Sequence, residues 1–182
     1  MRIRQSLSVI LPGLLLAACQ PPPTDDSADR GAMIGPEEGI IDPIESPDVE
    51  GAIWSPTSEP GRLLYGKPGQ TPLAALHCRT EDGVRTIEIT RFVITDKDAK
   101  AIQVLIGNGH SERLPIEAVW NGRAWIWQAT WPGTTSDLES LTGPREVEWT
   151  IPGAGSLILN PSPLPGRLIA RCRGLSLPAS MP

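Results

Sequence analysis

Side chains able to do covalent chemistry are few in this 182-residue chain, which holds three cysteines and two histidines. His77 lies in a run typical of a strand and is expected to play a structural role, pointing away from its neighbour Cys78. His110 follows a Gly-Asn-Gly turn sequence, and its adjacency to Ser111 does not make a nucleophile–base pair. The chain has no G-x-S-x-G, H-E-x-x-H or phosphate-binding glycine motif. These observations predict that the protein is not an enzyme.

Carboxylates offer the next chemistry to consider. Asp96 and Asp98 flank Lys97 and resemble a Ca²⁺-binding pair, but the further oxygen ligands of a calcium loop do not follow. A solvated turn is therefore expected, with no metal site and no cofactor. A catalytic site assembled from scattered acids is a third hypothesis; its candidates are Glu88, Glu117 and Asp137.

Tryptophan is the main aromatic residue, with six copies against one Phe and one Tyr. Trp125, Trp127 and Trp131 alternate along one predicted strand and so share a face. A two-residue Asn121-Gly122 turn would place Trp120 opposite Arg123 and set apolar residues across from the other tryptophans. We therefore expect this face to pack in the core, with an exposed binding platform as the alternative. Trp120 and Arg123 are the candidate binding surface.

The N-terminus carries a second kind of signal. Two arginines precede an apolar run that ends in Leu16-Ala17-Ala18-Cys19. This pattern is typical of a secretory signal peptide over residues 1–18, and its last four residues resemble the lipobox of bacterial lipoproteins. The resemblance implies that Cys19 becomes the lipid-modified N-terminus of an envelope protein facing the periplasm. Gln20, rather than Asp, favours the outer membrane over the inner one.

With Cys19 assigned to lipid, Cys78 and Cys172 form an even pair in a compartment where disulfides persist. We therefore predict a disulfide between them, with two free buried thiols as the alternative.

Charge divides the mature chain into two parts. Residues 20–60 hold ten acidic residues and one arginine, a net charge of −9, while residues 61–182 hold 11 acidic and 13 basic residues. High charge with many prolines disfavours a packed core. We expect residues 19–60 to be an acidic tether, disordered to about residue 50, and residues 61–182 to form one domain. A docking arm for a basic partner is the alternative to a simple spacer.

The domain reads as mainly β: a compact antiparallel sandwich or barrel of about seven or eight short strands with one or two short helices, closed by the disulfide. Strands are expected at residues 73–80, 84–94, 101–106, 114–120, 123–131, 146–151 and 157–160. Ser136 and Glu139 fit a helix capping box. Pro163 can start a helix that reaches Cys172, although a strand over residues 168–172 fits as well.

The cysteine plan and β-rich domain faintly resemble the lysozyme-inhibitor lipoproteins of Gram-negative bacteria, on Cys19, Cys78 and Cys172. The leading hypothesis is a non-enzymatic envelope lipoprotein, held by its lipid anchor, that binds an envelope protein or glycan. Inhibition of a cell-wall hydrolase is the alternative that the resemblance implies. The expected location and the weak basic balance of the domain disfavour nucleic acid as a partner.

Overall fold

Alternating inward and outward side chains build nine antiparallel strands in the computed structural model, which describes residues 44–175. The expected signal peptide, Cys19 and most of the expected tether lie outside these residues. The strands are β1 (Ile53–Pro56), β2 (Arg62–Gly66), β3 (Ala74–Glu81), β4 (Val84–Ile94), β5 (Lys100–Gly107), β6 (His110–Trp120), β7 (Trp125–Pro132), β8 (Val147–Ile151) and β9 (Gly155–Leu159).

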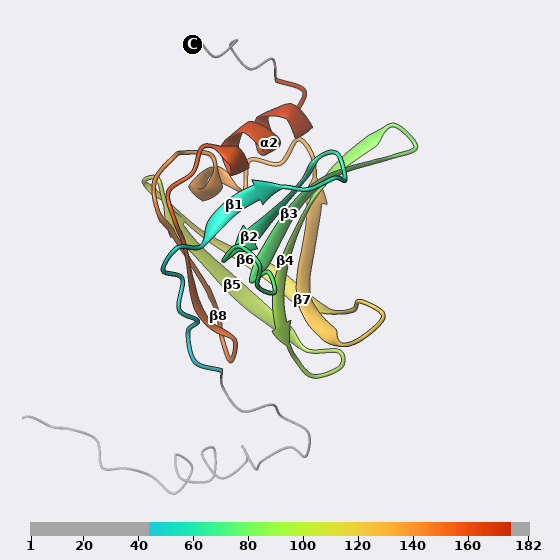
Figure 1. The fold of residues 1–182 in the computed structure, drawn as a ribbon. Helices are drawn as coiled ribbons and strands as arrows, with labels where there is room; N and C mark the ends of the chain where they lie inside the picture. The colour runs from blue at the N-terminus through green and yellow to red at the C-terminus, as the bar shows by residue number, and fades with distance from the viewer. Residues whose placement is uncertain (1–43, 176–182) are drawn as a thin grey trace, which may run out of the picture. The chain divides into compact units, whose positions relative to one another are not determined.

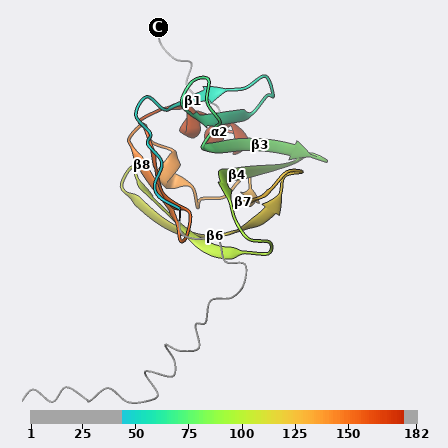
Figure 2. The ribbon, with the colours of Figure 1, turned by 60° about the horizontal axis from the view of Figure 1, so that its bottom comes forward.

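The strands form one sheet in the order β1-β2-β3-β4-β7-β6-β5-β8-β9. Figures 1 and 2 show this sheet curling until β1 approaches the β8–β9 hairpin, which makes a nearly closed barrel. The predicted fold class is confirmed. The two strands that the sequence did not predict are β1 and β2, which are four and five residues long.

The domain begins earlier than predicted. Residues 53–56 form β1, and Trp54 is buried against the Tyr65 ring at 5.2 Å between centroids. The predicted boundary at residue 61 is therefore wrong, because apolar residues near the end of the acidic stretch supply a strand that the barrel needs.

Hydrogen bonds from β9 and the residue after it hold residues 44–52 against the barrel. The Asn160 amide nitrogen donates to the Val49 and Ala52 carbonyls at 3.0 and 2.8 Å. The Tyr65 hydroxyl donates to the Ile158 carbonyl at 2.8 Å and accepts from the Asn160 N–H at 3.0 Å. The gap between β1 and β9 is thus bridged by side chains and by the preceding segment.

Two helical elements cover one end of the barrel (Figure 1). The α-helix α2 (Leu164–Cys172) decides the open choice at the C-terminal segment in favour of helix, and the Ser162 hydroxyl accepts a hydrogen bond from the Leu164 N–H at 3.2 Å. The capping box is wrong: η1 (Glu139–Leu141) is a single 3₁₀ turn without a side-chain cap. Within residues 44–175, neither helical element has the length and apolar character of a membrane span.

The predicted disulfide is confirmed. Cys78 of β3 and Cys172 of α2 are bonded, with their Cα atoms 5.7 Å apart and a sequence separation of 94. The buried residues of α2 include Leu168, Ile169 and Cys172. The bridge therefore fixes the buried side of α2 over the end of the barrel.

The core reading of the tryptophan face is confirmed at one end of β7. Trp127 and Trp131 are buried in the main hydrophobic cluster, while Trp125 is half-buried. Trp149 from β8 is fully buried in the same cluster. Large indole rings therefore fill an interior that has little Phe or Tyr.

Candidate functional site

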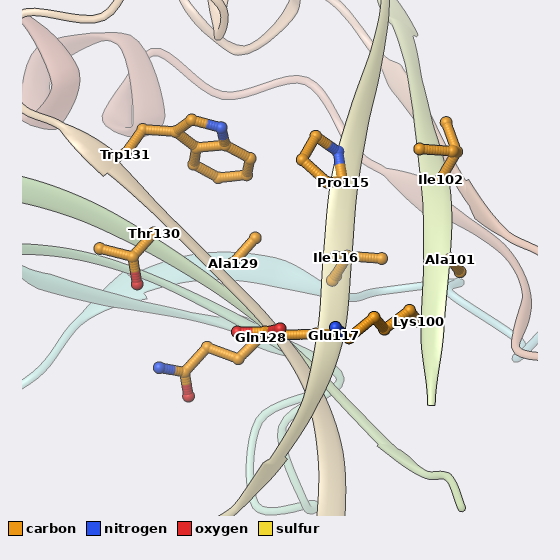
Figure 3. A pocket seen from close by; sticks show the side chains of 10 residues that line it. All are labelled: Lys100, Ala101, Ile102, Pro115, Ile116, Glu117, Gln128, Ala129, Thr130 and Trp131. Atoms are coloured by element: carbon orange, nitrogen blue, oxygen red, sulfur yellow. The ribbon is translucent and has the colours of Figure 1, made fainter. Parts of the chain in front are cut away.

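The barrel wall is split between β6 and β7. These strands pair only from Glu117 with Gln128 to Trp120 with Trp125, although both continue well beyond this short ladder. Figure 3 shows them diverging from Gln128 and Glu117 towards Trp131 and Pro115. Past the divergence, β6 pairs only with β5 and β7 only with β4.

Two prolines explain why the ladder stops. Continuing its register would place Pro115 opposite Thr130 and Arg113 opposite Pro132. The Ala118 N–H bonds to Ala99 on the β5 side. Because donors alternate sides along a strand, position 115 would have to donate towards β7.

The same alternation holds on β7. The Gly133 N–H donates to the carbonyl of Arg85 in β4, so position 132 would have to donate towards β6. Proline has no N–H and is rarely tolerated inside a sheet. Each of the next two pairs therefore contains one residue that cannot complete it.

A cavity of about 610 Å³ occupies this split. By the strand register, its inner wall is apolar, and its outer rim carries most of the polar side chains. The lining consists of Lys100, Ala101, Ile102, Pro115, Ile116, Glu117, Gln128, Ala129, Thr130 and Trp131. The cavity therefore has polar side chains towards the exterior and apolar side chains towards the interior.

Small side chains on the inner face help to leave this space open. The register places Ala101 and Ala129 on the inner side of the barrel, where both line the cavity. Elsewhere that face carries leucine, isoleucine and tryptophan. Alanine at these positions leaves empty the space that branched or aromatic side chains would fill in a close-packed interior.

The polar rim is partly tied to the neighbouring strand. The Gln128 amide nitrogen donates to the Glu88 carboxylate at 2.7 Å, and Arg79 lies 3.6 Å from the same carboxylate. These bonds orient the β7 side of the opening and leave its other side to Lys100 and Glu117.

The structure brings Trp120 and Arg123 to the hairpin tip, but their predicted pairing is wrong. Trp120 pairs with Trp125, with ring centroids 5.7 Å apart, because the turn is a four-residue loop. The Asn121 side-chain oxygen accepts from the N–H groups of Arg123 and Ala124 and closes that loop. Trp120 is 51% exposed and Arg123 is also exposed. Their role as a binding surface, at the tip of the β6–β7 hairpin, remains a prediction.

The other candidates lie apart from the cavity lining. His77 is buried on the outer side of β3, 3.5 Å from Glu59, and burial lowers its pKa from the ordinary 6.5. His110 is exposed at the first position of β6. Among residues 44–175, no group of three His, Cys, Asp or Glu side chains is placed to hold a metal ion.

Comparison with protein-family models, curated proteins and solved structures found no match.

The cavity combines an apolar inner lining with a rim of Lys100, Glu117, Gln128 and Thr130. Sequence reasoning missed it, because it assigned Pro115 and the residues near Pro132 to strands without asking which way each missing N–H would point. The signal in the sequence is a proline inside an otherwise regular strand pattern, because it removes a backbone donor from one side of the strand.

Proposed function

We propose that this protein is a lipid-anchored component of the bacterial envelope whose barrel binds an apolar or amphipathic ligand without catalysing a reaction. The observation that supports binding is the cavity of about 610 Å³ between β6 and β7. Small-molecule sites are typically of this size, with mostly apolar walls and a few polar groups. The anchor at Cys19 rests on the resemblance of the leader to a lipobox.

A fluorescent apolar probe tests the cavity. The full chain carrying Cys19→Ser, which removes the expected lipidation site and the need for detergent, is titrated with N-phenylnaphthylamine. We expect a saturable rise in fluorescence as the probe leaves water. Ala129→Leu fills the inner wall of the cavity and should weaken probe binding. Ala118→Leu is the matched control, because Ala118 shares the inner face but does not line the cavity.

Two results would count against the binding proposal: a fluorescence rise that does not saturate, or equal weakening by the Ala129 and Ala118 variants. The second result would mean that the probe binds elsewhere.

The anchor is tested separately in cells. Labelled palmitate should be incorporated into the native chain and recovered with the membrane fraction, whereas Cys19→Ser should carry no label and leave that fraction. Label that persists in the variant would contradict lipidation at this residue. Comparing outer and inner membrane fractions tests the preference expected from Gln20.

A second candidate, inhibition of a cell-wall hydrolase, draws on the Cys78–Cys172 bridge and the antiparallel barrel, two features of the resemblance that the structure contains. Lysozyme activity measured with micromolar protein decides it: a concentration-dependent loss of activity supports inhibition, and full activity rejects it. An envelope protein or glycan as partner also stays a proposal, tested by retention from an envelope extract.

A further inference from the structure

One end of the barrel exposes apolar side chains around its edge. Because neighbouring strands are antiparallel, the β2–β3, β4–β5, β6–β7 and β8–β9 connections share one end, and α2, which follows β9, covers the other (Figure 1). We call the end with these four connections the hairpin rim. Its exposed bulky side chains are Ile44 (38% exposed), Ile53 (51%), Ile94 (60%) and Trp120 (51%).

These four residues come from separate parts of the sheet. Ile53 begins β1, Ile94 ends β4 and Trp120 ends β6. Ile44 lies beside the β8–β9 turn, where its N–H donates to the Gly153 carbonyl at 2.9 Å. In the strand order, β1, β4, β6 and the β8–β9 turn are spread along the whole sheet. The apolar positions therefore follow the rim and do not gather in one pocket, which suits a broad surface better than a small ligand.

The tip of the β6–β7 hairpin is the most aromatic part of the rim. Trp120 pairs with Trp125, with ring centroids 5.7 Å apart, and the Trp125 carbonyl accepts a hydrogen bond from the Thr95 N–H at 3.0 Å. Ile94 precedes Thr95 and so lies beside the tryptophan pair. Tryptophan combines a large apolar ring with one polar N–H, and it is enriched where the hydrocarbon of a membrane meets water.

The charges at this end do not favour attraction to anionic lipid. The four connections and residues 44–52 hold five acidic and three basic residues: Glu45, Asp48, Glu50, Asp96, Asp98, Lys67, Lys97 and Arg123. The net charge is −2, and Lys67 is bound to Asp48 at 2.6 Å. Anionic headgroups attract clusters of basic residues. Apolar contact therefore has to provide the affinity of this rim for a membrane.

The described part of the chain also begins at this end. Ile44 lies on the rim, and 24 residues separate it from Cys19, the expected lipidation site. Even fully extended, a stretch of this length reaches no farther than about 80–90 Å. An anchor at Cys19 would make contact between the rim and the bilayer an intramolecular event, for which a weak interface is sufficient.

We propose that the hairpin rim rests on the phospholipid bilayer, with Trp120 and Ile94 inserted at the boundary between headgroups and acyl chains. This inference rests on the proposed anchor at Cys19 and is independent of the cavity. It orients the barrel with α2 directed away from the membrane.

Brominated lipid tests the contact. The native chain is purified from cells and reconstituted into phosphatidylcholine vesicles with bromine on their acyl chains, where bromine quenches tryptophan that it touches. Fluorescence is compared with that in the same vesicles without bromine. We expect quenching, and Trp120→Phe should remove at least half of it. Trp149→Phe is the control for the loss of one indole, because Trp149 is fully buried in the barrel and should not contribute to the quenching.

The two ends of β4 provide a matched pair of variants. Ile94 is the last residue of β4 and Val84 is the first, and they are 60% and 62% exposed. Ile94→Ser should reduce the quenching by at least about twofold, because it removes apolar area that enters the bilayer. Val84→Ser lies at the end of the barrel near α2 and should leave the quenching unchanged.

The outcomes separate this inference from the proposed function. A palmitate-labelled chain without bromine quenching overturns the contact and leaves the anchor and the cavity in place. Quenching that Trp120→Phe does not reduce, or equal effects of Ile94→Ser and Val84→Ser, overturns it as well. A chain that carries no label and does not sediment with vesicles overturns both the anchor and the contact. If soluble peptidoglycan fragments change the fluorescence of Trp120 and brominated lipid does not, the rim binds glycan and the bilayer contact is overturned.

Discussion

Replacing Pro115 and Pro132 by threonine tests whether the two missing N–H donors hold β6 and β7 apart. Threonine favours strands and supplies the donor that each unpaired position lacks. The variant should let the ladder continue through positions 115 with 130 and 113 with 132, in the register already set by Glu117 and Gln128.

The gain in stability follows from the bonds restored. Each completed pair can form two backbone hydrogen bonds, and at about 1 kcal/mol net for each bond the two pairs add about 4 kcal/mol. Each lost proline gives the unfolded chain more freedom, which costs about 0.4–1 kcal/mol per site. The free energy of unfolding should therefore rise by about 2–3 kcal/mol.

Urea denaturation measures that rise, and hydrogen exchange locates it. The Arg113 and Thr130 amides should exchange freely in the native protein and become protected in the variant, while probe binding falls because the cavity closes. Pro144→Thr with Pro161→Thr is the matched control, since both prolines lie outside the strands and are exposed. Unchanged exchange at Thr130, with stability no higher than in the control, would refute the explanation of the split.

Three further predictions concern stability. Converting Cys78 and Cys172 to alanine should lower the free energy of unfolding by about 4–5 kcal/mol, the chain-entropy value for a 94-residue loop, in urea titrations; a loss below about 1 kcal/mol would contradict it. Asn160→Ala should cost about 1–3 kcal/mol because the Val49 and Ala52 carbonyls lose their donor, with the loosening visible as faster proteolysis near residue 50; Asn121→Ala is the comparison at an exposed loop. Burial depresses the pKa of His77 in the folded state, so its contribution to stability is present above pH 6.5 and lost as the pH falls through the lower folded value. His77→Asn should flatten this acid-side slope in thermal melts, and an unchanged slope would assign it to other groups.

Much of the fold could be predicted because the strand pattern is local. The predicted strands 73–80 and 84–94 pair as β3 and β4 across the Asp82-Gly83 turn, where both residues have the positive φ that a tight hairpin requires. The Asn108-Gly109 turn has the same geometry, and β6 begins directly after it at His110, four residues before the predicted start at residue 114.

Errors arose where distant parts of the chain decide the outcome. The composition of residues 19–60 predicts a tether, yet Trp54 packs on Tyr65, and Asn160 from the far end of the domain binds the carbonyls of Val49 and Ala52. Asn121-Gly122 suggested the shortest turn, but the Asn121 side chain supports a longer loop. The cavity was beyond local reasoning, since it depends on two prolines in different strands meeting at one unpaired edge.

The segment that bridges β1 and β9 also has a mechanical consequence. Any tension applied from the N-terminal side reaches residue 44 before it reaches the barrel, and loads first the contacts of Ile44 with Gly153 and of Ser46 with Ser156. The load then passes to the carbonyls held by Asn160. If the chain is tethered through Cys19, a pull on the tether first strains the contacts between residues 44–52 and the β8–β9 hairpin. The end of the barrel under α2 stays held by the disulfide.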